Sequence, residues 1–271
     1  MSGENNEITN NPQTPGWDSR FYERSCLFWP IAQVASRFVS FTTWPEVSAY
    51  DELLAPLAGV FFRLQPPKPR RRRRREPIDP STLYDARIAA EGWVPTRFGS
   101  WHDFLNALVW ATFPESKRVF HERQQKAVAA RIGASMKVLP NTRTREQDGL
   151  AILDEGSLLL LVETSQWETI KAAHEARDIH PVADAIQQGK AVALAFGHAL
   201  YESLLLPREK AIWAMVVLLP CPGPIPTDAE TRIKMADQLL AERINTPNSF
   251  ADPTEFRSLP LEKRLCAPQK A

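Results

Sequence analysis

The sequence predicts an α+β fold in which a helical N-terminal half packs on a small, mainly antiparallel or mixed sheet. Apolar residues recur at spacings compatible with helices through much of the first 132 residues, whereas short continuous apolar runs, typical of buried strands, come later. Helices that precede strands, with a hairpin among the strands, favour this class over a regular alternation of strands and helices.

In the first half, the segment that Ser100 opens is the best-defined helix. Its apolar residues recur at i, i+3, i+4 and i+7 from Trp101 onward, and Ser100 with Asp103 fits a capping box. A second helix is expected from residue 114 to about 132. Upstream, helices are expected over residues 21–40 and 46–57, and a strand over residues 60–64.

The second half is expected to carry the sheet. Residues 150–153 and 158–162 predict a hairpin around a turn at residues 154–156. Further strands are expected over residues 191–195 and 212–219. Helices are expected over residues 166–175, 180–188, 197–205 and 228–243.

The chain has 271 residues, of which 44% are hydrophobic and 24% are charged, values close to the average for globular proteins. This length suffices for one large domain with a substantial core. The expected parts are a disordered N-terminus (1–18), an N-terminal helical part of the main domain (19–64), a Pro- and Arg-rich loop or linker (65–81), the main α+β domain (82–257) and a C-terminal tail (258–271).

The three cysteines, Cys26, Cys221 and Cys266, are far apart and odd in number. This pattern argues against a disulfide framework and against a structural zinc site, so a cytoplasmic location is expected. The N-terminus is polar where a signal peptide would be basic and then apolar. The apolar runs are shorter than the roughly 18 residues of a membrane span, so no transmembrane segment is expected.

A run of arginines lies within the predicted linker. Its members are Arg70, Arg71, Arg72, Arg73, Arg74 and Arg75. Because the chain has 33 basic and 32 acidic residues, the part outside this run keeps 27 basic residues and is net acidic. Arginines neutralise phosphates, which makes nucleic acid or an anionic surface a candidate partner. A solvated loop is the simpler interpretation, because no aromatic residues interleave the run.

The helix that Ser100 opens carries polar residues opposite its apolar stripe. His102 and Asn106 are one turn apart, and Asp103 is three residues before Asn106, so the three side chains are neighbours. A solvated face would more naturally carry Lys and Glu, which makes this face a candidate pocket wall. In the structural alternative, Asp103 caps the helix while His102 and Asn106 satisfy internal hydrogen bonds.

Charged residues just before the predicted hairpin form a second candidate group. Arg145, in an extended segment, could hold a carboxylate or phosphate of a substrate. Asp148 could be a metal ligand or a general acid or base. The same roles are open to Asp154 and Glu155, although ordinary turn chemistry explains this pair better.

The third candidate group follows an apolar strand. His198 and Glu202 are one helical turn apart, which suits two metal ligands or a base with its orienting carboxylate. Gly197 permits a close approach of the backbone. A surface ion pair explains the spacing equally well. The chain has no P-loop, GxGxxG, GxSxG or HExxH motif, so the common nucleotide-binding, α/β-hydrolase and zinc-peptidase classes lose support.

Several motifs occur together between residues 82 and 256. They are Tyr84-Asp85-Ala86-Arg87-Ile88, Val94-Pro95-Thr96-Arg97, Trp101-His102-Asp103-Phe104 with residues 106–110, Phe113-Pro114, residues 148–155, and Phe196-Gly197-His198-Ala199-Leu200 with Glu202. Together they resemble the bacterial domain-of-unknown-function family DUF3025, and Val-Pro-Thr-Arg followed by Trp-His-Asp is the most specific part. The resemblance implies boundaries for the domain and no activity, and it leaves the arginine run outside.

These observations favour an enzyme that hydrolyses an anionic substrate in a polar pocket, with a divalent metal ion as the candidate cofactor. His102 or His198 would be the general base. The remaining site residues would be Asp103, Asn106, Asp148 and Glu202, with Arg97 and Arg145 for the substrate. The hypothesis requires the two histidines to lie within about 15 Å of each other. The alternative is a non-catalytic binding or scaffold protein whose arginine loop contacts nucleic acid or an anionic surface.

Overall fold

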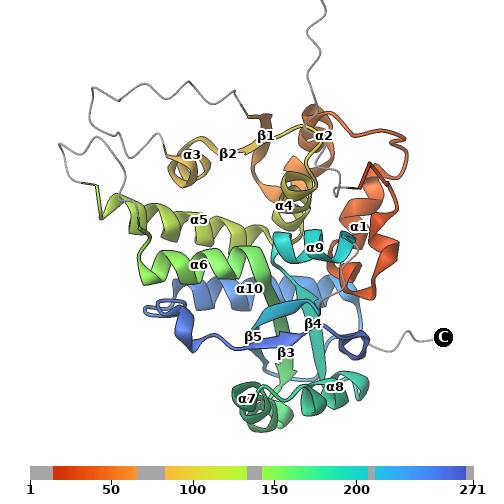
Figure 1. Cartoon of the computed structure of the whole chain (residues 1–271), viewed down its shortest axis with the longest axis vertical. Coiled ribbons are helices and arrows are strands. Elements are labelled where there is room, and N and C mark those ends of the chain that lie inside the picture. The colour runs from red at the N-terminus through yellow and green to blue at the C-terminus, as the bar shows by residue number, and fades with distance from the viewer. Residues whose placement is uncertain (1–14, 66–82, 133–141, 207–210, 267–271) are drawn as a thin grey trace, which may run out of the picture.

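The computed structural model describes residues 15–65, 83–132, 142–206 and 211–266, and they form the α+β fold that the sequence predicts (Figure 1). Four strands make a mixed sheet in the lower half of this view. They are β3 (Ser157–Glu163), β4 (Ala191–Ala195), β5 (Trp213–Cys221) and β6 (Ser258–Pro260), in the order β4-β3-β5-β6. β3 pairs antiparallel with β4 and parallel with β5, and β5 pairs antiparallel with β6.

The central strands are almost wholly buried. In β3 and β4 every residue except Glu163 is buried, which agrees with their continuous runs of Leu, Val and Ala. Strands that are covered on both faces need such runs because neither face meets water. The sheet is therefore the core on which the helices pack.

Helices around this sheet carry most of the polar candidate residues. They are α4 (Trp101–Thr112), α5 (Pro114–Ala129), α6 (Arg145–Gly156), α9 (His198–Leu205) and α10 (Ala229–Asn245). α4 contacts α9, and α5 contacts both α6 and α10. At the far end of the sheet lie α7 (Trp167–Ala176) and α8 (Ile179–Gln187).

The N-terminal part packs around α4, with α2 (Val47–Ala58) above it and α1 (Trp29–Ala35) beside it in Figure 1. Its strand β1 (Phe61–Leu64) pairs in parallel with β2 (Trp93–Thr96). α3 (Tyr84–Glu91) packs on α5. Within the described ranges, the 3-10 helices are η1 (Phe21–Arg24), η2 (Cys26–Phe28), η3 (Ser36–Phe38), η5 (Thr164–Gln166), η6 (Pro253–Glu255) and η7 (Lys263–Leu265). The helix expected over residues 21–40 is thus broken into α1 and short 3-10 turns.

The predicted hairpin was wrong, because its first strand and its turn belong to the helix α6. The Thr144 side chain accepts a hydrogen bond from the Gln147 N–H, while the Gln147 side chain accepts one from the Thr144 N–H. This capping box begins a helix, and Leu150 and Leu153 place its buried face at helical spacing. Only the second predicted strand exists, as β3.

The cysteine spacing was interpreted as evidence against a disulfide framework, yet two of the three cysteines form a bond. Cys26 and Cys266 form a disulfide with their Cα atoms 5.9 Å apart, although 240 positions separate them. Cys221 is free and buried. The bond ties η2, which packs on β4, to the C-terminal segment. The cytoplasmic location that was inferred from unpaired cysteines stays a prediction.

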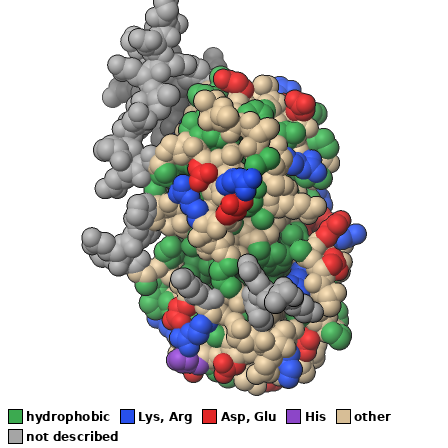
Figure 2. Space-filling view, turned by 90° about the vertical axis from the view of Figure 1, so that its right-hand side faces the viewer, with side chains coloured by type: hydrophobic (Ala, Val, Ile, Leu, Met, Phe, Trp, Pro, Cys, Tyr) green, Lys and Arg blue, Asp and Glu red, His purple; other side chains and the backbone are tan. Residues whose placement is uncertain are grey.

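The arginine run falls outside the described residues, so its role in contacting polyanions stays a prediction. On the face in Figure 2, the coloured Lys and Arg side chains are interspersed with Asp and Glu side chains. The described atoms of this face therefore form no continuous basic surface. Among the described helices, none combines the length and apolar character needed to cross a membrane.

Candidate functional site

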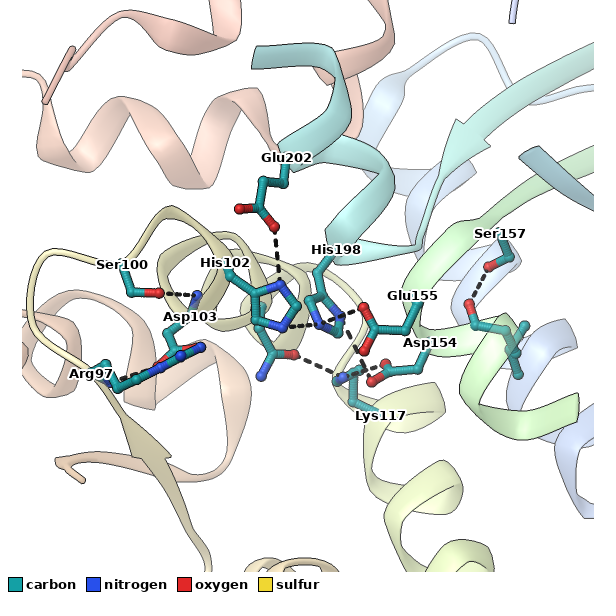
Figure 3. Close-up of polar contacts among 12 residues, drawn as sticks. Arg97, Ser100, His102, Asp103, Lys117, Asp154, Glu155, Ser157, His198 and Glu202 are labelled. Carbon is teal, nitrogen blue, oxygen red and sulfur yellow. Dashed lines mark hydrogen bonds and ion pairs between the residues drawn. The ribbon is translucent and has the colours of Figure 1, made fainter. Parts of the chain in front are cut away.

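Two histidines from different helices meet at one point of the structure (Figure 3). His102 lies in the first turn of α4 and His198 begins α9, and their Nε2 atoms are 3.1 Å apart. The packing of α4 against α9 brings them together. This distance meets the condition that the polar-pocket hypothesis sets.

Each of these histidines has a carboxylate on its Nδ1 side. His102 Nδ1 lies 3.1 Å from Glu202 Oε2, and His198 Nδ1 lies 3.7 Å from Asp154 Oδ2. The hydrogen bond to Glu202 favours a proton on Nδ1 of His102, which leaves the lone pair of its Nε2 available. His198 Nδ1 is buried and has no hydrogen-bond partner among the described residues.

A third donor group reaches the same space. Glu155 Oε2 lies 3.4 Å from His198 Nε2. One donor atom each of His102, Glu155 and His198 lies within 4.8 Å of the other two. Glu155 stands near the end of α6 with 49% of its side chain exposed, so this group opens to solvent. The arrangement can hold a metal ion.

The close approach of two backbone segments explains how Glu155 and His198 come together. The N–H groups of Phe196 and Gly197 both donate to the Ser157 carbonyl oxygen at 3.0 Å. A Cβ atom on Gly197 would lie only 2.5 Å from the Glu155 carbonyl oxygen. Glycine is therefore needed at this position, as the sequence analysis expected.

A buried lysine forms hydrogen bonds to two of the polar residues around the histidines. The side chain of Lys117, on α5, is fully buried, and its Nζ donates to Asp154 Oδ1 at 2.5 Å and to Asn106 Oδ1 at 2.9 Å. Burial alone would raise the pKa of Asp154, but positive charge nearby, above all that of Lys117, lowers this pKa to about 2. Asp154 is therefore ionised beside His198.

The two histidines differ in their protonation. Burial lowers the pKa of His198 to about 4, so its ring is neutral at pH 7. The hydrogen bond to Glu202 raises the pKa of His102, and the same bond lowers the pKa of Glu202. Because metal ions bind neutral imidazole, His198 is already in the binding form at neutral pH.

The two histidines, Asp154 and Glu155 line a cleft of about 360 Å³. Tyr84, Arg97 and Asn106 add donors to its wall. Arg97 is held by Asp103, which accepts from Nη2 at 2.7 Å and from Nε at 2.9 Å, so Asp103 positions an arginine instead of facing the histidines. Burial raises the pKa of Tyr84, so its hydroxyl stays protonated.

Residues 74–263 match the family described as "Protein of unknown function (DUF3025)". The chain belongs to the DUF3025 family. The match includes His102, Glu155 and His198, and it begins within the arginine run, so that Arg74 and Arg75 fall inside it. Neither a curated protein nor a solved structure matches this DUF3025 protein.

In this DUF3025 protein, two predicted site residues lie apart from the histidines. Arg145 Nη2 pairs with Asp252 Oδ1 at 2.5 Å, and Asp148 is exposed in the first turn of α6. Neither residue lines the cleft. Both residues were expected in an extended segment that leads into a strand, whereas they lie in the first turn of α6, which gives their side chains other directions. The catalytic roles of the residues that do meet stay predictions.

Several further residues that the DUF3025 fold brings to the site had weaker signals in the sequence. Asp154 and Glu155 were assigned to a turn, and Lys117 was not considered. The spacing held a signal, since Lys117 follows Phe113 by four residues and precedes His121 by four, which places it on the buried face of α5. A lysine on an apolar face needs a buried partner.

Proposed function

We propose that this protein binds a divalent metal ion through His102, Glu155 and His198 and hydrolyses a small anionic substrate in the adjoining cleft. The observation that carries the proposal is the convergence of two imidazole Nε2 atoms and one carboxylate at the cleft wall. Two histidines and a carboxylate form a common ligand set of catalytic zinc sites, in which water or substrate takes the next position.

The spacing of the donor atoms supports this proposal. A tetrahedral zinc ion, with ligands at about 2.0–2.1 Å, places neighbouring donor atoms roughly 3.4 Å apart. The Nε2 atoms of His102 and His198 are 3.1 Å apart, and His198 Nε2 is 3.4 Å from Glu155 Oε2. Two of the three separations therefore fit one shared ion, and all three donor atoms lie within 4.8 Å of one another.

The charge balance of the site supports the same conclusion. Asp154 pairs with Lys117 and Asp103 pairs with Arg97. Glu155 and Glu202 have only histidine partners among the ion pairs of the described residues. Two carboxylates without a Lys or Arg partner match the charge of a divalent cation.

The residues around the ion would then have separate roles in positioning its ligands and in binding the substrate. Glu202 fixes the His102 ring, and Lys117 holds Asp154 beside His198. Arg97, Tyr84 and Asn106 offer N–H and O–H groups to an anionic substrate. A bound divalent ion would lower the pKa of its water and supply the nucleophile for hydrolysis.

Metal binding is tested by calorimetric titration of chelator-treated protein with Zn²⁺ and with Mn²⁺. We expect one ion per chain, and we expect His102→Ala and His198→Ala each to abolish binding. His180→Ala is the matched control, because His180 is exposed on α8 and contacts Arg264. Unchanged affinity in both site variants would contradict the proposal.

Hydrolysis is tested with p-nitrophenyl phosphate, bis-p-nitrophenyl phosphate and an anionic carboxylic ester as probes. We expect metal-dependent turnover of at least one probe, with loss of turnover in Glu155→Gln. Glu168→Gln on α7 is the control, because that side chain is exposed and outside the cleft. If the metal binds and no probe is turned over, the metal site stands and the hydrolytic assignment fails.

A further inference from the structure

A second cleft lies between α7, β5 and the end of α10, and it shares no residue with the first. Its volume is about 470 Å³, which is within the usual range of small-molecule sites. Trp167 of α7 and the buried Val216 and Leu218 of β5 give it an apolar wall. An aromatic ring could pack on this wall.

Three cationic side chains converge on the same cleft. They are Lys171, Arg243 and Arg257. None of them forms an ion pair with a carboxylate of the described residues, and Glu175 is the one acidic residue in the described lining. Cations gathered without acidic partners repel one another unless an anion lies among them. The described lining thus carries two more positive than negative charges.

Backbone hydrogen bonds hold both arginines in place. The strand β6 pairs with β5 only as far as Met215, so Leu218 lies beyond the part of β5 that β6 covers. Arg243 Nη1 donates a hydrogen bond to the Leu218 carbonyl oxygen there, at 2.6 Å. Arg257 Nη1 donates to the Thr254 carbonyl oxygen at 2.8 Å. Arg257 Nη1 also donates to the Phe256 carbonyl oxygen at 3.4 Å, and the Arg243 guanidinium packs over the Phe250 ring. Among the described residues, no other hydrogen bond of these two guanidinium groups is found, and the contacts fix their orientation in advance.

A buried polar atom beside the arginines completes the wall. His174 lines the cleft, and its Nε2 atom is buried and has no hydrogen-bond partner among the described residues. Burial lowers the pKa of His174, the backbone groups of Arg257 and Val216 oppose this shift, and the charges of Arg243 and Arg257 add to it. The ring of His174 therefore contributes polar surface to the wall without a further positive charge.

We propose that this second cleft binds a phosphate monoester with an aromatic body. The phosphate lies among Lys171, Arg243 and Arg257, and the ring packs on Trp167. Two excess positive charges match the dianion of a phosphate monoester, and the planar fork of arginine matches phosphate oxygens. The site is separate from the proposed metal centre, so each can exist without the other.

The probe for this proposal is phenyl phosphate, titrated into the full chain and followed by calorimetry and tryptophan fluorescence. We expect saturable binding that Lys171→Ala and Arg257→Gln each weaken by about tenfold or more, since each removes a charged hydrogen-bond donor. The controls are Lys234→Ala and Arg118→Gln, which change exposed cations away from the cleft. Circular dichroism verifies that each variant is folded.

Comparison probes separate the parts of the proposal. We expect phenol not to bind and inorganic phosphate to bind more weakly than phenyl phosphate, because the ring contributes contact with Trp167. Equal affinity for the two phosphates would overturn the aromatic part. The proposed phosphate site would be contradicted if phenyl phosphate showed no saturable binding, or if both variants kept the wild-type affinity. It would also be contradicted if binding were lost only in Arg97→Gln, which changes the first cleft.

Discussion

The Nε2 atoms of His102 and His198 lie 3.1 Å apart, although 96 positions separate the two residues. At this distance two imidazole rings share one hydrogen bond or bind one ion between them. Glu202, on the far side of the His102 ring, holds a proton on Nδ1 and leaves Nε2 as an acceptor, which both arrangements require. Glu155 Oε2, 3.4 Å from His198 Nε2, adds the third donor atom that an ion would need.

Glu202→Gln is expected to weaken Zn²⁺ binding by about 10- to 100-fold without abolishing it. Glutamine keeps the shape of the side chain but loses the charge that orients the His102 ring. Calorimetric titration at pH 7 measures the change, and Glu168→Gln is the control. Wild-type affinity in Glu202→Gln would show that Glu202 does not position a metal ligand.

The sequence predicted most elements of the fold because their signals were local. Ser100 begins α4 as expected, with its Oγ accepting from the Asp103 N–H at 3.3 Å. The continuous apolar runs became β3, β4 and β5. The error at α6 had a physical cause: Leu-Ala-Ile-Leu alone fits a strand or a helix, and the capping residues Thr144 and Gln147 decide between them.

The site was predictable in part for the same reason. His102, Asn106, His198 and Glu202 were singled out because helical spacing makes each pair neighbours. No local pattern joins α4 to α9, or Lys117 to Asp154 across 37 positions. The disulfide between Cys26 and Cys266 is likewise a product of tertiary packing, so spacing could not reveal it.

Gly197→Ala is expected to lower the free energy of unfolding by about 1–3 kcal/mol, the usual cost of overpacking. The backbone angles at Gly197 suit any residue, with φ −60° and ψ 121°, so the cost comes from space alone. The added Cβ would meet the Glu155 carbonyl oxygen at 2.5 Å. Urea unfolding measures the effect.

The matched control for that substitution is Gly156→Ala. Gly156 lies at the same junction of the chain, yet a Cβ there would meet nothing within 4 Å. We therefore expect a small effect from Gly156→Ala and a weaker metal affinity from Gly197→Ala, since Glu155 must shift. Equal stabilities of the two variants would argue against the close approach.

Loss of the disulfide is expected to lower the free energy of unfolding by about 2–5 kcal/mol. The bond links residues 240 positions apart, so it restricts a long loop of the unfolded chain. Unfolding of Cys26→Ser, compared with the wild type in the presence and absence of a reductant, measures the loss. The reductant should destabilise only the wild type, and detection of free Cys26 and Cys266 thiols by mass spectrometry in non-reduced protein would contradict the bond.

Lys117→Met is expected to destabilise the metal-free protein by about 3–5 kcal/mol at pH 7, because it leaves the Asp154 carboxylate buried without its cation. In the wild type the pKa of Asp154 is held at about 2, so its stabilising charge is present at neutral pH and is lost as the pH falls toward that value. Without Lys117, burial raises this pKa, and protonation of Asp154 then favours the folded state.

The penalty of Lys117→Met should therefore shrink as the pH falls from 7 to about 4, where Asp154 of the variant takes up a proton. Urea unfolding at both pH values, with a chelator present, measures the two penalties. Lys126→Met is the control, because Lys126 is an exposed lysine of the same helix and should give a small effect at either pH. A penalty that stays constant between the two pH values would mean that the cost comes from packing of the lysine side chain and not from the charge of Asp154.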